Sequence, residues 1–277
     1  MQSNDNFSKL SRSRRALLRQ VQVNIPFTML FDEYLDRFLS YGLNPEIGID
    51  AAALERFDVS NFQRIAEKLH AHHLSTTLHG PFIDLSAGST DPAIKAATRS
   101  RFKQLLELAP VFRPAAVVCH AGYDWKRYGS FRDEWIESSL DTWSWLAGSL
   151  VEHGSRLMLE NVYEDDPQDI RIILEGLKSQ NVGFCLDAGH LCAFGQAELK
   201  PWLEGLGPYI GQLHLHDNHG QEDLHLPPGK GSIDYAPLLS VLKQTPDPWS
   251  VTVEGKSFEE NQVAHDWASA HLPGYQP

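Results

Sequence analysis

Residues 182–217 read VGFCLDAGHLCAFGQAELKPWLEGLGPYIGQLHLHD, and this stretch decides the fold class. It contains two short apolar runs, Val182–Asp187 and Ile210–His216, separated by helical spacing over Leu199–Leu206. Apolar runs of this length are typical of strands that are buried on both faces of a parallel sheet. A helix between two such strands is the repeating unit of α/β folds. The stretch therefore predicts one strand–helix–strand unit of a parallel α/β fold.

The same alternation runs through the whole chain of 277 residues. Strands are predicted over Val21–Phe27, Glu46–Asp50, Thr76–Gly80, Ala115–His120, Arg156–Asn161, Val182–Asp187, Ile210–His216 and Ser250–Glu254. Helices are predicted over Leu30–Tyr41, Ser60–His73, Pro92–Leu108, Phe131–His153, Pro167–Ser179, Leu199–Leu206, Tyr235–Lys243 and Glu259–His271. Eight such units predict a single-domain (β/α)₈ TIM barrel over residues 16–277, with residues 1–15 as a flexible tail. An open doubly wound sheet is the rival fold, but no GxGxxG turn follows the first strand.

Composition limits the classes of partner. The formal net charge of −12 argues against a nucleic-acid partner, because such proteins usually neutralise phosphates with a basic face. No run of about 18 apolar residues occurs, so no membrane span is expected. The N-terminus lacks an apolar signal segment, and Cys119, Cys185 and Cys192 read as free thiols, so we expect a cytoplasmic protein. A homodimer is left open, because no surface pattern decides the oligomeric state.

Polar side chains stand where six consecutive predicted strands end, from the third to the eighth. They are His79, His120, Glu160, Asp187 with His190, His214 with His216, and Glu254. Strand ends of a (β/α)₈ barrel converge on the face that carries the active site. Imidazoles and carboxylates together are ligands of zinc, manganese or iron. The strand ends therefore predict a metal site, with zinc or manganese preferred; for any single histidine, a hydrogen-bonded structural role is the alternative.

One loop adds to this set. The segment between Asp217 and Asp234 is the longest after any predicted strand, and its glycines and prolines indicate a structured functional loop. Asp223 and His225 lie within it, two residues apart, and we expect them to add ligands above the site.

At these residues the sequence resembles the xylose isomerase-like TIM barrel superfamily. That superfamily includes sugar phosphate isomerases and epimerases and the related endonuclease IV (AP endonuclease 2) family. The motifs that carry the resemblance are LHGPF, CHAGYD, LENV, DAGH, LHLHDN, DLHLPPGKG and VEG, between His79 and Glu254.

The resemblance implies two alternative ligand sets, with one to three divalent ions. Sugar isomerases and epimerases bind one ion through four strand-end residues, which here are Glu160, Asp187, His214 and Glu254. Endonuclease IV enzymes bind three zinc ions through nine residues, all of matching type here: His79, His120, Glu160, Asp187, His190, His214, Asp223, His225 and Glu254.

Two departures separate the chain from the nuclease pattern. His216 stands where the nuclease motif has Asn, and Lys230 stands where it has Glu. We therefore predict a metal-dependent isomerase or epimerase of a small-molecule sugar or sugar phosphate, in which Glu160 and Glu254 remove and return a proton. The residues predicted to contact the substrate are His190, His216, Trp125 and Lys230; for His190 and His216 the alternative is a role in supporting the metal ligands. The alternative is metal-assisted phosphoester hydrolysis, as in abasic-site cleavage; a sugar-binding or metal-storing barrel without activity is a third class.

Overall fold

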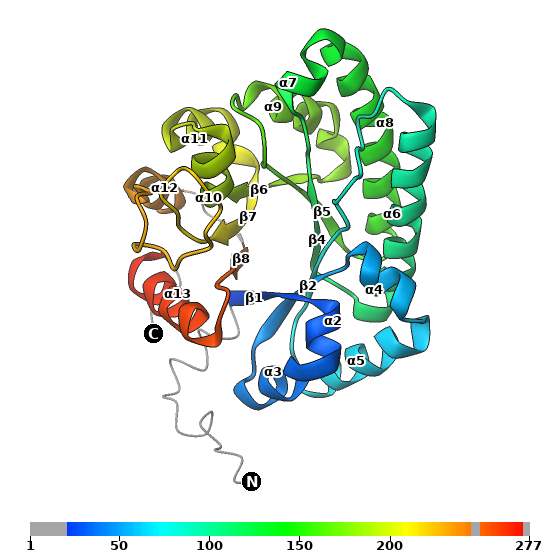
Figure 1. Ribbon diagram of the computed structural model, residues 1–277, viewed down its shortest axis with the longest axis vertical. Helices are drawn as coiled ribbons and strands as arrows, with labels where there is room; N and C mark the ends of the chain where they lie inside the picture. Colours follow the sequence, from blue (N-terminus) through cyan, green and yellow to red (C-terminus); the bar gives the residue numbers. More distant parts are fainter. Residues whose placement is uncertain (1–20, 245–249, 274–277) are drawn as a thin grey trace.

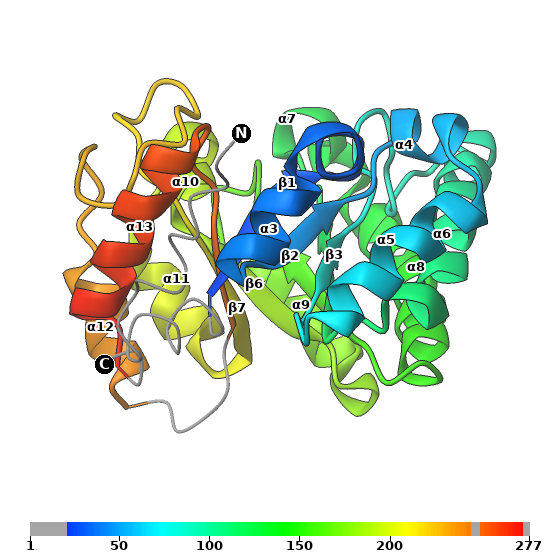
Figure 2. The same cartoon turned by 90° about the horizontal axis from the view of Figure 1, so that it is seen from below.

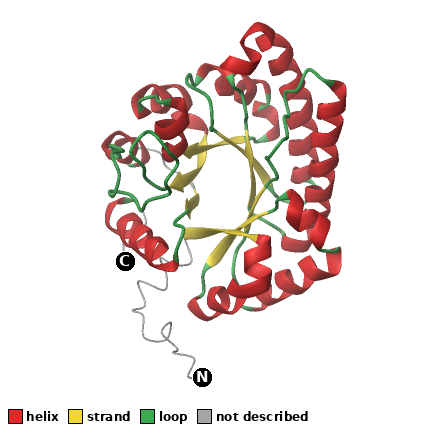
Figure 3. Ribbon diagram, viewed as in Figure 1, coloured by secondary structure: helices red, strands yellow, loops and turns green. Residues whose placement is uncertain are grey.

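The computed structural model describes residues 21–244 and 250–273. Eight parallel strands close into a barrel in sequence order, with β8 paired to β1 (Figures 1 and 3). The strands are β1 (Val21–Pro26), β2 (Asn44–Gly48), β3 (Thr77–His79), β4 (Ala116–His120), β5 (Arg156–Glu160), β6 (Gly183–Asp187), β7 (Ile210–Leu215) and β8 (Ser250–Val253). The predicted TIM barrel is confirmed, and the open doubly wound sheet is wrong. The tail predicted over residues 1–15 lies outside the described residues.

A ring of helices surrounds the barrel (Figure 3). The longer ones are α3 (Leu35–Tyr41), α5 (Val59–Ala71), α6 (Pro92–Phe112), α8 (Arg132–Val151), α9 (Gln168–Gly176), α11 (Leu199–Leu206), α12 (Ala236–Leu242) and α13 (Phe258–His271). Each matches a predicted helix, with ends that differ by a few residues. Short segments that were not predicted include α2 (Phe27–Met29), α4 (Ala51–Arg56), α7 (Trp125–Tyr128) and α10 (Ala188–His190). No helix within residues 21–244 and 250–273 combines the length and apolarity that crossing a membrane requires.

Helix α6 was predicted to end at Leu108, before Pro110, but it continues through the proline to Phe112. A proline inside a helix removes one backbone hydrogen bond, so the last turn needs a compensating contact. Phe112 supplies it: the ring is buried and meets Phe27 and Phe62 edge-on, each at 6.3 Å between ring centroids. This aromatic cluster holds α2, α5 and α6 together.

A polar layer crosses the middle of the barrel interior. Glu46 of β2 is fully buried, and its Oε2 accepts hydrogen bonds from Thr77 Oγ1 (2.8 Å), Thr252 Oγ1 (3.0 Å) and Gln212 Nε2. Side chains alternate between the two faces of a strand. The residues two positions further along β3, β7 and β8 therefore also point inward, at the carboxyl end of the barrel. The polar layer thus lies directly below the predicted ligands.

The loop between β7 and α12 is ordered by one buried carboxylate. Asp217 pairs with Leu226 in an antiparallel bridge, and its side chain accepts hydrogen bonds from the backbone N–H groups of Asn218, Gly229 and Ile233. Figure 2 shows the loop at the same end of the barrel as α7 and α10, which follow β4 and β6. The expected structured loop is therefore present, and it lies at the ligand-bearing end.

Candidate metal centre

All nine predicted ligands lie together at the carboxyl ends of the strands. The strands supply His79, His120, Glu160, Asp187, His214 and, just after β8, Glu254; α10 supplies His190, and the loop after β7 supplies Asp223 and His225. Their side chains form overlapping groups of three or four residues, in which one ligand atom of each lies within 4.8 Å of the others. Groups of this kind have the size of a metal site.

Glu160 stands in the middle of the cluster and is fully buried. Its Oε2 lies 3.1 Å from His79 Nε2 and 3.6 Å from His120 Nε2. Its Oε1 lies 3.1 Å from both His190 Nδ1 and His214 Nδ1. Burial acts to raise the pKa of Glu160, but the surrounding imidazoles, His214 first, hold that pKa well below its usual range. Glu160 is therefore a carboxylate whose two oxygens face different pairs of histidines.

The first group consists of His79, His120 and Glu160. His79 Nδ1 donates to the backbone oxygen of Gly80 at 3.0 Å, which leaves Nε2 toward Glu160. Burial lowers the pKa of His120 to about 3, since Glu160 offsets only part of the effect. The ring of Phe82 stacks on His120 with centroids 4.2 Å apart. His120 is thus a neutral, positioned imidazole, the form that binds a metal ion.

The central group lies on the Oε1 side of Glu160 and contains Asp187, His214 and Glu254. His214 Nδ1 is 3.3 Å from Glu254 Oε1 and 3.8 Å from Asp187 Oδ2. With Glu160, these residues are the four that the resemblance to sugar isomerases implies for a single ion. The structure brings all four together.

Two residues that hold the central group were not predicted from the sequence. Glu46 Oε1 lies 2.9 Å from His214 Nε2, and Asn24 Nδ2 donates to Glu254 Oε1 at 3.1 Å. Asn24 occupies an inward position on β1 and Glu46 one on β2, and the carboxylate that follows β2, Asp50, caps α4. A buried glutamate inside a strand is costly unless it is paired. A glutamate within an otherwise apolar strand was therefore the feature of the sequence that would have identified Glu46.

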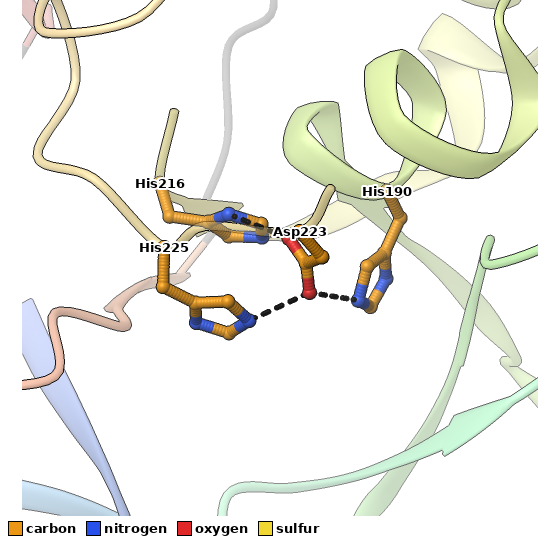
Figure 4. A group of neighbouring side chains, drawn as sticks. All are labelled: His190, His216, Asp223 and His225. Carbon is orange, nitrogen blue, oxygen red and sulfur yellow. Dashed lines mark hydrogen bonds and ion pairs between the residues drawn. The ribbon is translucent and has the colours of Figure 1, made fainter. Parts of the chain in front are cut away.

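The third group consists of His190, His216, Asp223 and His225 (Figure 4). Asp223 lies between His190 on one side and the rings of His216 and His225 on the other. Its Oδ2 is 2.8 Å from His225 Nε2 and 3.5 Å from His190 Nε2, and its Oδ1 is 3.3 Å from His216 Nδ1. His216 was predicted to contact the substrate, but it is fully buried and is not among the residues that line the cavity above the site.

The donor set fits divalent ions. His79, His190 and His225 each donate one ring N–H to a backbone carbonyl oxygen, at 3.0, 3.1 and 2.9 Å. The other ring nitrogen of each is left facing a carboxylate. This arrangement is usual for histidines that bind metals, because it fixes the tautomer and the ring orientation. Nitrogen and oxygen ligands in this mixture suit zinc or manganese.

A cavity of about 450 Å³ opens above the cluster, within the usual range for small-molecule sites. The ligands that line it are His79, His120, Glu160, His190, Asp223, His225 and Glu254. Its rim carries four apolar side chains that are largely exposed: Phe82 (42%), Ile83 (67%), Tyr163 (52%) and Phe194 (43%). Trp125 and Lys230, predicted to contact the substrate, are exposed and do not line this cavity.

A second cavity, of about 750 Å³, adjoins the first. The two share Asn24, Pro26, His225 and Glu254. Its lining is mainly apolar and aromatic, and it includes the basic residues Arg37 and Lys256. The space beside the ligands is therefore larger than the first cavity alone.

Comparison with known proteins gives the same picture of the fold. The Thermus thermophilus protein TTHB071, in a crystal soaked with ZnCl₂, superposes with a TM-score of 0.77 at 26% identity, over 91% of this chain and 97% of that one. A D-tagatose 3-epimerase-like protein superposes with a TM-score of 0.76 at 20% identity, over 91% of this chain and 96% of that one. A probable endonuclease 4 of Symbiobacterium thermophilum is 25% identical over 187 residues, 61% of this chain and 67% of that protein.

The family model described as xylose isomerase-like TIM barrel matches residues 45–272. The match spans seven of the eight strands, β2 to β8, and all of the predicted ligands. The chain belongs to the xylose isomerase-like TIM barrel family.

Proposed function

We propose that this chain is a metal-dependent phosphoester hydrolase that acts on a small molecule with an apolar or aromatic group. The position of Glu160 carries the proposal. Its Oε2 lies 3.1 Å from His79 and its Oε1 lies 3.1 Å from both His190 and His214, so both oxygens stand among side chains that can bind metal ions. With ions bound on both sides, Glu160 would be placed to help hold each of them. Clustered ions are typical of enzymes that cleave phosphoesters.

Divalent ions in these groups supply positive charge for a transferring phosphoryl group and activate a water molecule. The protein places the reactants around them. His79, His120 and Glu160 line the cavity and present the first group to the substrate. Glu254 also lines it, fixed from behind by Asn24, and is placed to orient the attacking water. The water oxygen forms a new bond to phosphorus as the ester P–O bond breaks, and the proton that the water loses is returned to the leaving oxygen of the alcohol or phenol.

The cavity rim supports a substrate with an apolar or aromatic part. Tyr163 and Phe194 pack against each other with ring centroids 5.5 Å apart, while both remain about half exposed. Exposed aromatic side chains at a cavity mouth are placed to bind a ring of the substrate. Arg101 lines the same cavity but is paired with Glu55 at 2.7 Å, so the rim offers little for a polynucleotide backbone.

The test uses the purified chain loaded with zinc or manganese. Bis(4-nitrophenyl) phosphate and 4-nitrophenyl phosphate report cleavage of a diester and a monoester, and a duplex with one abasic site reports nuclease activity. We expect hydrolysis of a small ester that chelation abolishes, that added ions restore, and that Glu160→Gln removes. No cleavage by protein that holds two or more ions per chain would overturn the proposal. Cleavage of the duplex alone would overturn the small-molecule assignment.

A sugar isomerase or epimerase is the second candidate. The observation that favours it is the meeting of Glu160, Asp187, His214 and Glu254 around one position, with Glu160 and Glu254 available as a proton-transfer pair. Proteins of the same fold that are named as sugar epimerases agree with this candidate. One ion per chain, together with exchange of the carbonyl-adjacent hydrogen of a ketose in deuterated water, would support it. Two or three ions and no exchange would count against it.

A further inference from the structure

The third group contains an imidazole that the family resemblance does not account for. His216 stands where the related nuclease motif has Asn, and it is fully buried beside His225. The two rings are stacked, with centroids 4.1 Å apart and an interplanar angle of 11°. Both present their edges toward Asp223 (Figure 4).

The hydrogen bonds around the group fix which ring nitrogen is free. His190 Nδ1 donates to a backbone oxygen at 3.1 Å, and His225 Nδ1 donates to another at 2.9 Å. His216 Nε2 donates to the Asp187 carboxylate at 2.9 Å. A neutral imidazole has a single N–H. Once each ring is neutral, its remaining nitrogen has a lone pair for a bound ion, and all three of these nitrogens face Asp223.

Two buried atoms in this group lack hydrogen-bond partners. His216 Nδ1 and Asp223 Oδ1 lie 3.3 Å apart, and neither makes a hydrogen bond within the described parts of the chain. An unsatisfied buried polar atom costs about 1–3 kcal/mol, so such atoms are rare in native proteins. Two acceptors facing each other across this distance are what a bound cation satisfies.

The neighbouring backbone makes room for the extra ring. A Cβ atom added at Gly189, the residue before His190, would overlap the ring of His216. Glycine at this position therefore permits the imidazole to reach Asp187 on one side and Asp223 on the other. The close approach of Gly189, just after β6, to His216, just after β7, leaves space for this ring. The placement of His216 is therefore built into the packing of the two strand ends.

We infer that His216 is a fourth protein ligand, through Nδ1, of an ion that His190, Asp223 and His225 also bind. Four protein ligands are typical of structural zinc sites, whereas catalytic sites keep one position open. The parallel rings of His216 and His225 require one of them to turn to share an ion, and His225, whose side chain is 27% exposed, has room to do so.

A closed site has a consequence for the loop after β7. Asp223 and His225 belong to that loop, while His190 follows β6 and His216 follows β7. An ion held by all four ties the loop to the barrel beside the active-site cavity. The third ion would then hold the cavity wall in place and would not meet the substrate. This inference rests on the metal-binding part of the proposed function and not on the reaction.

The test compares His216→Asn, which restores the residue of the nuclease motif, with His219→Asn, the same change at an exposed position of the same loop. In a chelator competition, we expect His216→Asn to lower the affinity for one ion per chain by at least about tenfold. Loss of a group that only supports a ligand already has an effect of this size. Cobalt-substituted protein should lose part of its tetrahedral visible absorption, and limited proteolysis should cut the loop. The His219→Asn control should match the wild type in all three measurements.

A second variant separates the loss of a ligand from misfolding of the chain. Gly189→Ala leaves every ligand in the chain but displaces the ring of His216, so it should reproduce the loss of the same ion. Circular dichroism of the metal-free proteins verifies the fold. Wild-type ion count, affinity and cobalt spectrum in both variants would overturn the inference. Loss of the ion in both, with no phosphoester cleaved by any form, would leave the inference standing while the proposed reaction fails.

Discussion

Replacing Glu46 with glutamine tests whether the polar layer inside the barrel sets the affinity of the central group. Glu46 never reaches the cavity, but its Oε1 lies 2.9 Å from His214 Nε2 while the opposite ring nitrogen faces the ligands. The glutamine oxygen can still accept from Thr77 and Thr252, so the barrel interior keeps its shape. What changes is the group behind His214: the negative charge is lost, and the amide NH₂ that replaces Oε1 cannot accept a hydrogen bond from His214 Nε2.

The expected size follows from that charge. Two unit charges about 4 Å apart interact by about 4 kcal/mol at an effective dielectric constant of about 20, and this is an upper limit here because a metal-bound imidazole is neutral. The amide dipole and the retained hydrogen bonds recover part of this, and removing a supporting carboxylate behind a metal-binding histidine typically costs about tenfold to a hundredfold in affinity. We therefore expect a loss of about 1.4–2.7 kcal/mol for the ion bound by His214.

Chelator competition on Glu46→Gln measures the loss, with Glu67→Gln, an exposed site on α5, as the control for one lost charge. The affinity should fall only for the ion at the central group, while the affinity of the third group for its ion stays unchanged. Wild-type affinity for every ion in a folded Glu46→Gln protein would refute the view that Glu46 supports His214. A loss at all groups alike would instead indicate general damage to the barrel.

Three further outcomes are expected. Burial acts to lower the pKa of His225, but Asp223 and its neighbouring carboxylates raise that pKa to about 9. Because an ion at the third group must displace this proton, the affinity measured by calorimetry should rise from about pH 6 to 8. An affinity that does not change over this range would contradict the prediction. Tyr163→Ala or Phe194→Ala should raise KM for an aryl ester by up to about tenfold with kcat little changed, because only ring contacts are lost; a fall in kcat alone would argue otherwise. Gly231→Ala, whose Cβ would overlap the backbone of Asn218, should destabilise the fold by about 1–3 kcal/mol in urea unfolding, and unchanged stability would contradict that packing.

Periodicity carried most of the fold prediction. Each of the eight strands was predicted within a few residues, because strands buried on both faces are near-continuously apolar and therefore conspicuous. Short helices were missed for the opposite reason. Segments such as α4 and α7 are one or two turns long, and their position depends on an Asp cap, Asp50 or Asp124, that stands in what otherwise reads as a loop.

The site was predictable where it followed the strand ends and unpredictable where it depended on contacts across the barrel. Glu46 belongs to a strand whose end is unremarkable, and only its inward position beside His214 gives it a role. His216 was predicted either to contact the substrate or to support the metal ligands, and the sequence does not decide between the two. Its burial and its bond to Asp187, which decide otherwise, arise from the meeting of β6 and β7. Lys230 lies on the loop after β7 and Trp125 begins the short helix α7, and the sequence does not fix the course of either segment.

The three groups differ in how far they reach the cavity, and this difference assigns them different tasks. Every member of the first group, His79, His120 and Glu160, lines the cavity, so an ion there is open to substrate. In the third group His190, Asp223 and His225 line the cavity, whereas His216 is buried behind them. Glu160 belongs both to the first group and to the central one. Glu160 therefore links the first group to the central one, so a change in the ion at the first group would alter the charge around the central group. On our inference, the third group would act on the reaction by holding the loop that forms part of the cavity wall.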